Sequence, residues 1–291
     1  MSAPRIWVLC GAHKTASTHF QRILTSQPGR LARAGTVVIP PKVVRREIMP
    51  LVDRARGIAF PARIKAELAD TLARLAPGAG RILICDENLL GGTEPRMLLR
   101  GGALYPWGPA RVGRLLSLLP PAEVRVALAL RSMATFLPSA YAENLFHFPY
   151  VTFDAFLEDA DPAALSWHDL LVRMREETDA KVTLWRYEDY PAVAPAALGA
   201  LLGRGVAADL EIPSQPARVG LSAEAIEEVA RADGKGNPVP KLGALKKTFP
   251  KGSRFHAFQP FATANARALE DIYCADMAKI WAMSGVQVLQ P

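Results

Sequence analysis

Five short apolar runs, separated by longer segments with helical spacing, constrain the fold of this chain more than any other feature. Continuous apolar runs of this length are typical of strands buried on both faces, as in a parallel sheet. The runs are "RIWVLC" (5–10), "GTVVIP" (35–40), "RILICD" (81–86), "VRVALAL" (124–130) and "KVTLWRY" (181–187). Between them, the segment after Cys10 and the segments 61–76, 110–119 and 161–177 favour helices. This alternation predicts a three-layer α/β fold with a central, mainly parallel five-stranded sheet flanked by helices.

The last third of the chain has a different pattern, because the strand signal stops after residue 187. Segment 191–291 is expected to be mainly helical, with helices over 191–203, 222–232 and 262–283. The Gly/Pro/Lys-rich stretch 233–261 is predicted as a long basic loop, which is either a functional lid or a solvated excursion. No internal repeat divides the sequence, so residues 1–291 are predicted to form a single domain.

The charge balance is basic, with a net charge of +7 and a sequence pI of about 9.5. Such a balance favours an anionic partner. However, no block of five like charges occurs, and aromatic residues do not alternate with basic ones. The excess charge is therefore dispersed, and we expect a small anionic ligand rather than nucleic acid.

Cysteine content and hydropathy point to a reducing compartment. Cys10, Cys85 and Cys274 are too few and too scattered for a disulfide framework or a zinc site. The apolar run near the N-terminus is too short for a signal peptide, and no stretch reaches the roughly 18 apolar residues of a spanning helix. We therefore expect a cytoplasmic protein without stable membrane insertion, and the sequence leaves its oligomeric state open.

The stretch "LCGAHKTASTHFQRIL" (9–24) joins the first predicted strand to a predicted helix. The first N–H groups of a helix have no internal partner, and the helix dipole adds positive potential, so such a junction binds anions. Lys14 would add a charge, and Thr15, Ser17 and Thr18 would add hydroxyl donors. The lysine comes too early for the Walker pattern G-x-x-x-x-G-K-(S/T), because only two residues separate it from Gly11.

At this point the sequence resembles the sulfotransferases that use 3′-phosphoadenosine 5′-phosphosulfate (PAPS). Their phosphosulfate loop reads K-(S/T)-G-(S/T)-T, and "KTAST" (14–18) is similar, with Ala16 in place of the glycine. Their R-x7-S element resembles "LRSMATFLPSAY" (130–141), in which Arg131 and Ser139 are eight residues apart. The resemblance implies a P-loop-like fold for the predicted sheet.

Four further segments extend this resemblance over most of the chain. They are "ILICDENLLG" (82–91), "RYEDY" (186–190), "FPKGSRF" (249–255) and "YCADMAKI" (273–280). The sequence also departs from the family. Ala16 is expected to permit helix geometry but not a positive φ. His19 stands where the cytosolic animal members carry a tryptophan near the adenine, and 249–255 lacks the double basic pair of many relatives.

The resemblance implies a role for each candidate donor-binding residue. Lys14, Thr15, Ala16, Ser17 and Thr18 would hold the 5′-phosphosulfate, and Lys14 would neutralise charge on the bridging oxygen. Arg131 and Ser139 would grip the 3′-phosphate, while Lys251 and Gly252 would close over it. Tyr187 would approach the adenine, although packing of a strand aromatic explains it equally well. The family's chemistry requires no metal, and we found no spacing typical of metal ligands.

The acceptor's proton needs a base, and we expect Glu87 to be that base because it follows the third strand. Asp86 would orient Lys14 or cap the next turn. His13 and His147 are rivals, the first more typical of a hydrogen-bonding spacer and the second of a packed aromatic turn. The glycine-punctuated segment 88–108 is a natural acceptor wall, in which Tyr105 and Trp107 either stack the acceptor or pack within the loop.

These interpretations lead to one preferred function and two alternatives. We expect a PAPS-dependent sulfotransferase that modifies a hydroxyl or amine of a carbohydrate, lipid or small molecule and releases 3′,5′-bisphosphate (PAP). The first alternative is a P-loop nucleotide-dependent phosphotransferase, which the early position of Lys14 disfavours. The second is a non-catalytic anion-binding protein on the same scaffold.

Overall fold

A parallel sheet of six strands forms the centre of the molecule. The computed structural model describes residues 3–59, 61–214, 219–235 and 241–291. The strands lie in the order β2-β3-β1-β4-β5-β6, and each neighbouring pair is parallel. Their bounds are β1 Arg5–Leu9, β2 Thr36–Ile39, β3 Arg81–Cys85, β4 Glu123–Leu130, β5 Lys181–Arg186 and β6 Val286–Val288. The predicted α/β class is thus confirmed, with a sixth strand that the sequence analysis missed because it is only three residues long.

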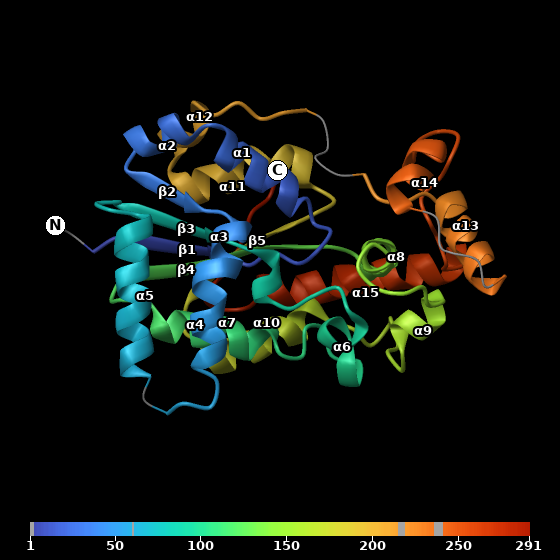
Figure 1. Ribbon diagram of the computed structural model, residues 1–291, viewed down its shortest axis with the longest axis horizontal. Helices are drawn as coiled ribbons and strands as arrows, with labels where there is room; N and C mark the ends of the chain where they lie inside the picture. Colours follow the sequence, from blue (N-terminus) through green and yellow to red (C-terminus); the bar gives the residue numbers. More distant parts are fainter. Residues whose placement is uncertain (1–2, 60, 215–218, 236–240) are drawn as a thin grey trace.

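Helices cover both faces of the sheet, which explains why its strands are apolar throughout. Along β1, Ile6 and Val8 belong to one buried cluster, whereas Trp7 and Leu9 belong to the other. Figure 1 shows one helical layer on each side of the strands. The first layer contains α1 (Ser17–Ser26), α2 (Pro28–Arg33), α11 (Tyr190–Leu202) and α12 (Arg204–Ala208). The second contains α4 (Met49–Arg54), α5 (Ala62–Leu75), α7 (Gly108–Leu118), α10 (Trp167–Glu177) and α15 (Thr263–Trp281).

The predicted helix over 161–177 begins later than expected. Ser166 caps α10, its hydroxyl accepting a hydrogen bond from the Asp169 N–H at 3.0 Å. Residues 162–164 form a turn instead, which the Asp161 carboxylate stabilises by accepting from the Ala163 N–H. A polar cap therefore fixes the start of this helix more strongly than its apolar spacing does.

The remaining helices extend the molecule beyond the carboxyl ends of the strands (Figure 1). They are α8 (Met133–Asn144), α9 (Phe153–Leu157), α13 (Ala223–Gly234) and α14 (Leu242–Thr248). Shorter elements lie in the connections: α3 (Pro41–Val43), the π-helix η1 (Val44–Ile48), α6 (Pro95–Leu98), and the 3₁₀ turns η2 (Glu87–Leu89) and η3 (Arg100–Gly102). The prediction that 233–261 lacks secondary structure was wrong, because α13 continues to Gly234 and α14 follows. Residues 236–240 of that segment lie outside the described residues.

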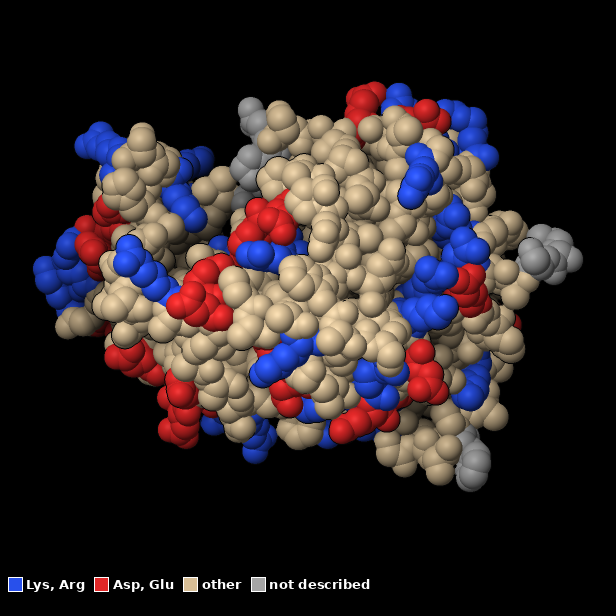
Figure 2. Space-filling view, turned by 180° about the vertical axis from the view of Figure 1, so that it is seen from behind, with Lys and Arg blue, Asp and Glu red and all other residues tan. Residues whose placement is uncertain are grey.

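The topology marks one edge of the sheet as the place for a ligand. From β1 the chain moves to β2 at one side of the sheet, and from β4 it moves to β5 at the other. The carboxyl ends of β1 and β4 therefore flank a switch point, where open α/β sheets bind their ligands. On the face shown in Figure 2, Lys and Arg side chains are interspersed with Asp and Glu. Among the described residues, no helix combines the length and apolar character needed to cross a bilayer.

Candidate active site

The loop between β1 and α1 contains two strained residues. Lys14 (φ 62°) and Ala16 (φ 63°) both adopt the left-handed conformation, so the expectation that Ala16 avoids positive φ was wrong. This conformation costs an L-residue roughly 1–2 kcal/mol, and it persists only where the surroundings enforce it. Thr15 lies between them, buried, and its hydroxyl donates to the Ala12 carbonyl at 2.6 Å. These features turn the chain sharply from the strand into the helix.

A cavity of about 630 Å³ opens above the carboxyl ends of the strands, next to this loop. Its volume is in the range typical of small-molecule and cofactor sites, about 300–1,000 Å³. Most of the predicted site residues line it: Lys14, Ala16, Ser17, Thr18, Glu87, Arg131, Ser139, Tyr187 and Lys251. Thr15 does not line it, since its hydroxyl points back into the loop. Gly252 follows Lys251 but is not part of the wall either, and its N–H donates to the Phe255 carbonyl.

Three cations from three separate elements meet at this cavity. Lys14 comes from the loop after β1, Arg131 from the end of β4, and Lys251 from the segment after α14. Lys251 is exposed as a residue, yet partial desolvation, followed by the charges of Arg131 and Lys14, lowers its pKa. Like charges thus repel one another here, and a bound anion would relieve that repulsion.

Arg131 is fixed in place by several contacts. Its guanidinium donates to the Lys14 carbonyl at 2.7 Å and to the Thr135 hydroxyl at 2.9 Å. It also lies over the Tyr187 ring, 4.2 Å from the ring centroid. Tyr187 therefore both packs against Arg131 and lines the cavity, so both interpretations of this residue remain. Ser139 lines the cavity one turn further along α8 than Thr135.

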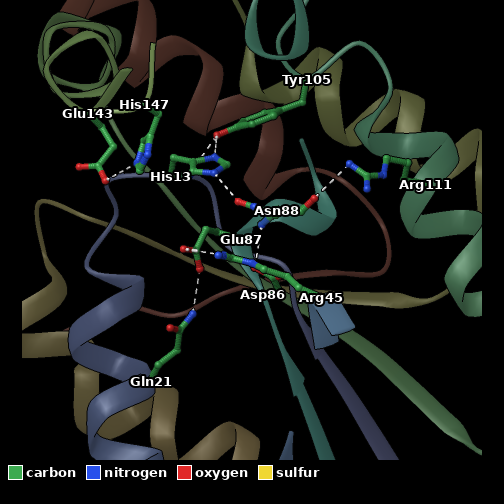
Figure 3. Close-up of polar contacts among 10 residues, drawn as sticks. All are labelled: His13, Gln21, Arg45, Asp86, Glu87, Asn88, Tyr105, Arg111, Glu143 and His147. Atoms are coloured by element: carbon green, nitrogen blue, oxygen red, sulfur yellow. Dashed lines mark hydrogen bonds and ion pairs between the residues drawn. The ribbon is translucent and has the colours of Figure 1, made fainter. Parts of the chain in front are cut away.

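The carboxylates that follow β3 have different surroundings (Figure 3). Asp86 is fully buried and accepts hydrogen bonds from Arg45 at 2.7–3.1 Å and from the Asn88 N–H at 3.1 Å. Asp86 thus caps the next turn, whereas the alternative that it orients Lys14 was wrong, because it holds Arg45. Burial raises the pKa of Asp86, and the hydrogen bonds and charge of Arg45 act in the opposite direction.

Glu87 lies at the cavity wall and is held by two side chains. Its carboxylate accepts from the Gln21 amide at 3.0 Å and pairs with Arg45 at 3.3 Å. Burial alone would raise the pKa of Glu87. The Gln21 hydrogen bond, the residue's own backbone N–H and the charge of Arg45 outweigh burial and lower that pKa. Glu87 is therefore ionised at neutral pH and able to accept a proton.

The two rival histidines differ in their surroundings. His13 is buried, with its Nδ1 3.0 Å from the Tyr105 hydroxyl and its Nε2 3.0 Å from the Asn88 amide oxygen (Figure 3). Burial lowers the pKa of His13, which leaves the ring neutral at pH 7 and engaged as a hydrogen-bonding spacer. His147 is not packed in an aromatic turn as expected. Its side chain is 57% exposed and lies 3.6 Å from Glu143.

The two aromatic residues of the predicted acceptor wall also differ. Tyr105 is fully buried and packs near His13, Phe136 and Trp167, so it packs within the fold and cannot stack a ligand. Trp107 is 45% exposed and lies near Arg100, but it is not among the described residues that line the cavity. Whether the segment forms the acceptor site therefore stays a prediction.

Three residues at the site were missed by the sequence analysis. Arg45 comes from the π-helix η1, a rare element that frequently marks functional sites. Glu143 lines the cavity from α8, and its carboxylate pairs with the Lys14 ammonium at 2.8 Å. Tyr190 fixes His19 by a contact of 2.8 Å between its hydroxyl and Nδ1. Arg45 and Glu143 carry no local signal in the sequence, because their partners are distant in the chain. Tyr190 belongs to the segment "RYEDY" (186–190), but the segment alone does not indicate its contact with His19.

The other end of the cavity is largely apolar. His19 reaches the Pro213 carbonyl through its Nε2 at 2.7 Å and thereby holds segment 212–214 against α1. Ile212 and Val219 line this end and are partly exposed. A flat, apolar group such as a nucleobase would find suitable surroundings here. Across the described parts of the chain, no group of three or more His, Cys, Asp or Glu residues could hold a metal ion.

Comparisons with known proteins provide little further information. No protein-family model matches the chain, and no curated protein matches it. The solved sulfotransferase domain from the curacin biosynthetic pathway is similar over 95% of this chain and 98% of its own, with 11% identity and a TM-score of 0.41. A structure from the PezAT toxin–antitoxin system of Streptococcus pneumoniae is similar over 95% and 87%, with 10% identity and a TM-score of 0.28. Because both TM-scores are low, the function has to be inferred from the site itself.

Proposed function

We propose that this protein is a PAPS-dependent sulfotransferase, which moves a sulfuryl group to a hydroxyl or amine of an acceptor and releases PAP. The observation that carries the proposal is the convergence of Lys14, Arg131 and Lys251 on one cavity. A ligand with two separate anionic groups would compensate three cations better than a single phosphate would. The apolar end around Ile212 and Val219 would then receive the adenine.

Each residue would act on a defined part of the reaction. The acceptor oxygen or nitrogen forms a bond to sulfur while the bond between sulfur and the bridging oxygen of the 5′-phosphate breaks. Lys14 and the N–H groups at the start of α1 would stabilise the charge that develops on that oxygen. Glu87 would accept the proton that the acceptor loses. Arg131 and Lys251 would hold the 3′-phosphate and so position the donor.

Two contacts favour this proposal over a phosphotransferase. In a P-loop phosphotransferase, a Ser or Thr of the loop and an Asp after a strand hold Mg²⁺. Here the corresponding hydroxyl of Thr15 donates to the Ala12 carbonyl, and the buried Asp86 carboxylate is held by Arg45. Both groups would have to leave these partners in order to bind a metal ion.

One observation favours the non-catalytic alternative. Glu87 is held by Gln21 and Arg45, and its pKa is lowered, so it is a weaker base than an ordinary glutamate. A cavity that only binds an anionic ligand would need no base at all. Binding and turnover therefore have to be measured separately.

Thermal unfolding in the presence of PAP tests the donor site. A ligand at 100 times its dissociation constant adds about 2.7 kcal/mol to the free energy of unfolding. We expect stabilisation by PAP that a chelator does not abolish, and a much smaller effect of Mg·ATP. Lys14→Met should weaken the PAP effect, whereas Lys65→Met, which removes an exposed lysine on α5 away from the cavity, should not. Stabilisation by Mg·ATP alone would instead support the phosphotransferase.

Turnover with labelled PAPS and a set of acceptors tests the reaction. Glu87→Gln should retain PAP binding and lose sulfuryl transfer by about 10²–10⁴-fold, the usual contribution of a positioned base. Full activity in this variant would remove Glu87 from the role of base. PAP binding by the wild type without transfer to any acceptor class would favour the non-catalytic alternative.

A further inference from the structure

The ammonium of Lys14 is already engaged by a carboxylate. Its Nζ lies 2.8 Å from Oε2 of Glu143, and both side chains are largely buried, with 15% and 18% of their surfaces exposed. Both residues line the cavity. In Figure 3, Glu143 and His147 lie beside the loop that carries His13. A carboxylate therefore occupies the position next to Lys14 that the anionic end of a donor would take.

The main chain of Lys14 is held independently of its side chain. Arg131 donates to the Lys14 carbonyl at 2.7 Å, and the residue has a fixed left-handed conformation. The four-carbon stem of a lysine is flexible, and its ammonium is a point charge without a required direction. Lys14 can thus exchange one anionic partner for another by moving its side chain only.

The part of α8 that carries Glu143 is anchored on both sides of this residue. The next residue, Asn144, is buried and donates from its side chain to the Thr93 carbonyl at 3.1 Å. Two residues before Glu143, the Tyr141 hydroxyl donates to the Val151 carbonyl at 2.8 Å. Ser139 precedes Glu143 by one helical turn on α8, and both line the cavity. The main chain of α8 thus keeps Glu143 at the cavity wall, and its Oε1 lies 3.6 Å from Nε2 of His147, a second partner that does not depend on Lys14.

We propose that Glu143 is an internal competitor of the donor: the 5′-phosphate end must displace this carboxylate from Lys14 in order to bind. This inference rests on the proposed function and concerns the regulation of the same site. Only molecules in which Lys14 is released from Glu143 can bind the donor. The apparent affinity for the donor therefore equals the intrinsic affinity multiplied by the fraction of such molecules. Glu143 thereby selects for ligands whose anionic group interacts strongly enough with Lys14 to replace it.

Calorimetric titration with two ligands tests this competition. PAP carries both phosphates, whereas 3′-AMP lacks the 5′-phosphate that would meet Lys14. Glu143→Gln keeps the size of the side chain and removes its charge, so PAP affinity should rise about tenfold, as expected when a close charge pair is lost. The affinity for 3′-AMP should not change. Glu87→Gln is the matched control, since it removes a carboxylate from the same cavity that pairs with Arg45 instead.

The outcomes separate this inference from the proposed function. A gain in PAP affinity confined to Glu143→Gln supports the competition, and an intermediate gain in Glu143→Asp, whose carboxylate is withdrawn by one methylene, supports it independently. Unchanged PAP affinity in Glu143→Gln, or equal gains in Glu87→Gln or with 3′-AMP, overturns the competition while PAP binding itself stands. Absence of PAP binding to the wild type and to both Glu143 variants overturns the proposed function, and the competition with it.

Discussion

Replacement of Ala16 by glycine is a direct test of the unusual loop geometry. Alanine is normally the better residue within a helix, so Ala→Gly substitutions there usually destabilise a protein. Ala16, however, has a φ of 63° and precedes α1 in the left-handed conformation. Glycine adopts this conformation without a steric penalty. The structure therefore predicts that glycine does not have its usual disadvantage at position 16.

The size of the effect follows from three contributions. Glycine removes a left-handed penalty of about 1–2 kcal/mol. Glycine lowers the free energy of unfolding by about 0.4–1 kcal/mol, because it makes the unfolded chain more flexible. Glycine also loses the partly buried methyl group of Ala16, which packs against the buried cluster that contains Trp7 and Leu9, and this loss costs roughly a further 0.4 kcal/mol. The sum places the variant between about 0.4 kcal/mol less stable and about 1.2 kcal/mol more stable than the wild type.

Urea unfolding of Ala16→Gly beside a helical control provides the measurement. Ala66 is exposed in the middle of α5, and Ala66→Gly should lower the free energy of unfolding by about 1 kcal/mol. We expect the two variants to differ by about 1–2 kcal/mol, with Ala16→Gly the more stable. Equal destabilisation of both variants would show that Ala16 is not left-handed and would refute the reasoning.

Three further predictions concern the same site and its support. Asp86→Asn should lower the free energy of unfolding, measured in urea, by about 2–3 kcal/mol, because Arg45 stays charged and loses its buried partner. An unchanged free energy of unfolding would contradict the structural role of Asp86. A bound anion favours the ammonium of Lys251, so PAP affinity should fall as pH rises through the lowered pKa of this residue. In Lys251→Arg, affinity should stay level over the same pH range, because the guanidinium remains charged, and a parallel fall in both proteins would exclude Lys251 as the cause. Gly113→Ala should lower thermal stability by about 1–3 kcal/mol, because the added Cβ on α7 would lie 2.7 Å from the Cβ of Glu177 at the end of α10; unchanged stability would mean that these helices separate easily.

The sheet could be predicted from the sequence because its strands are buried on both faces. Runs such as 81–86 and 124–130 have no polar face, and parallel strands between two helical layers are among the few structures that bury them completely. The short strand Val286–Val288 has too few residues to show this pattern. Helix α14 was missed because glycine, proline and lysine dominate its surroundings, while a single buried residue, Leu245, holds it to the core.

The site could be predicted only where its residues lie in local motifs. Lys14 follows a strand and precedes a helix, and Arg131 follows another strand, so the topology brings both to one edge of the sheet. Arg45 and Glu143 are recognisable only through their partners Asp86 and Lys14, which lie 41 and 129 residues away in the chain. The left-handed Ala16 was misjudged because the residue type argues against it, and the surrounding loop overrides that preference.

The distribution of charge over the elements indicates where the rate of the proposed reaction must come from. Residues 10–19 contain no acidic side chain, so every carboxylate at the loop is supplied by another element. In the proposed reaction Lys14 would meet the leaving phosphate, and Arg131 and Lys251 would hold the 3′-phosphate of the donor. Glu87, in contrast, is held by Gln21 and Arg45 and has a lowered pKa. A carboxylate with a lowered pKa is a weaker base, and general-base catalysis by it therefore contributes less to the reaction rate. Stabilisation of the leaving group and positioning of the donor would therefore supply most of the rate acceleration. This agrees with a reaction in which negative charge develops on the departing phosphate oxygen.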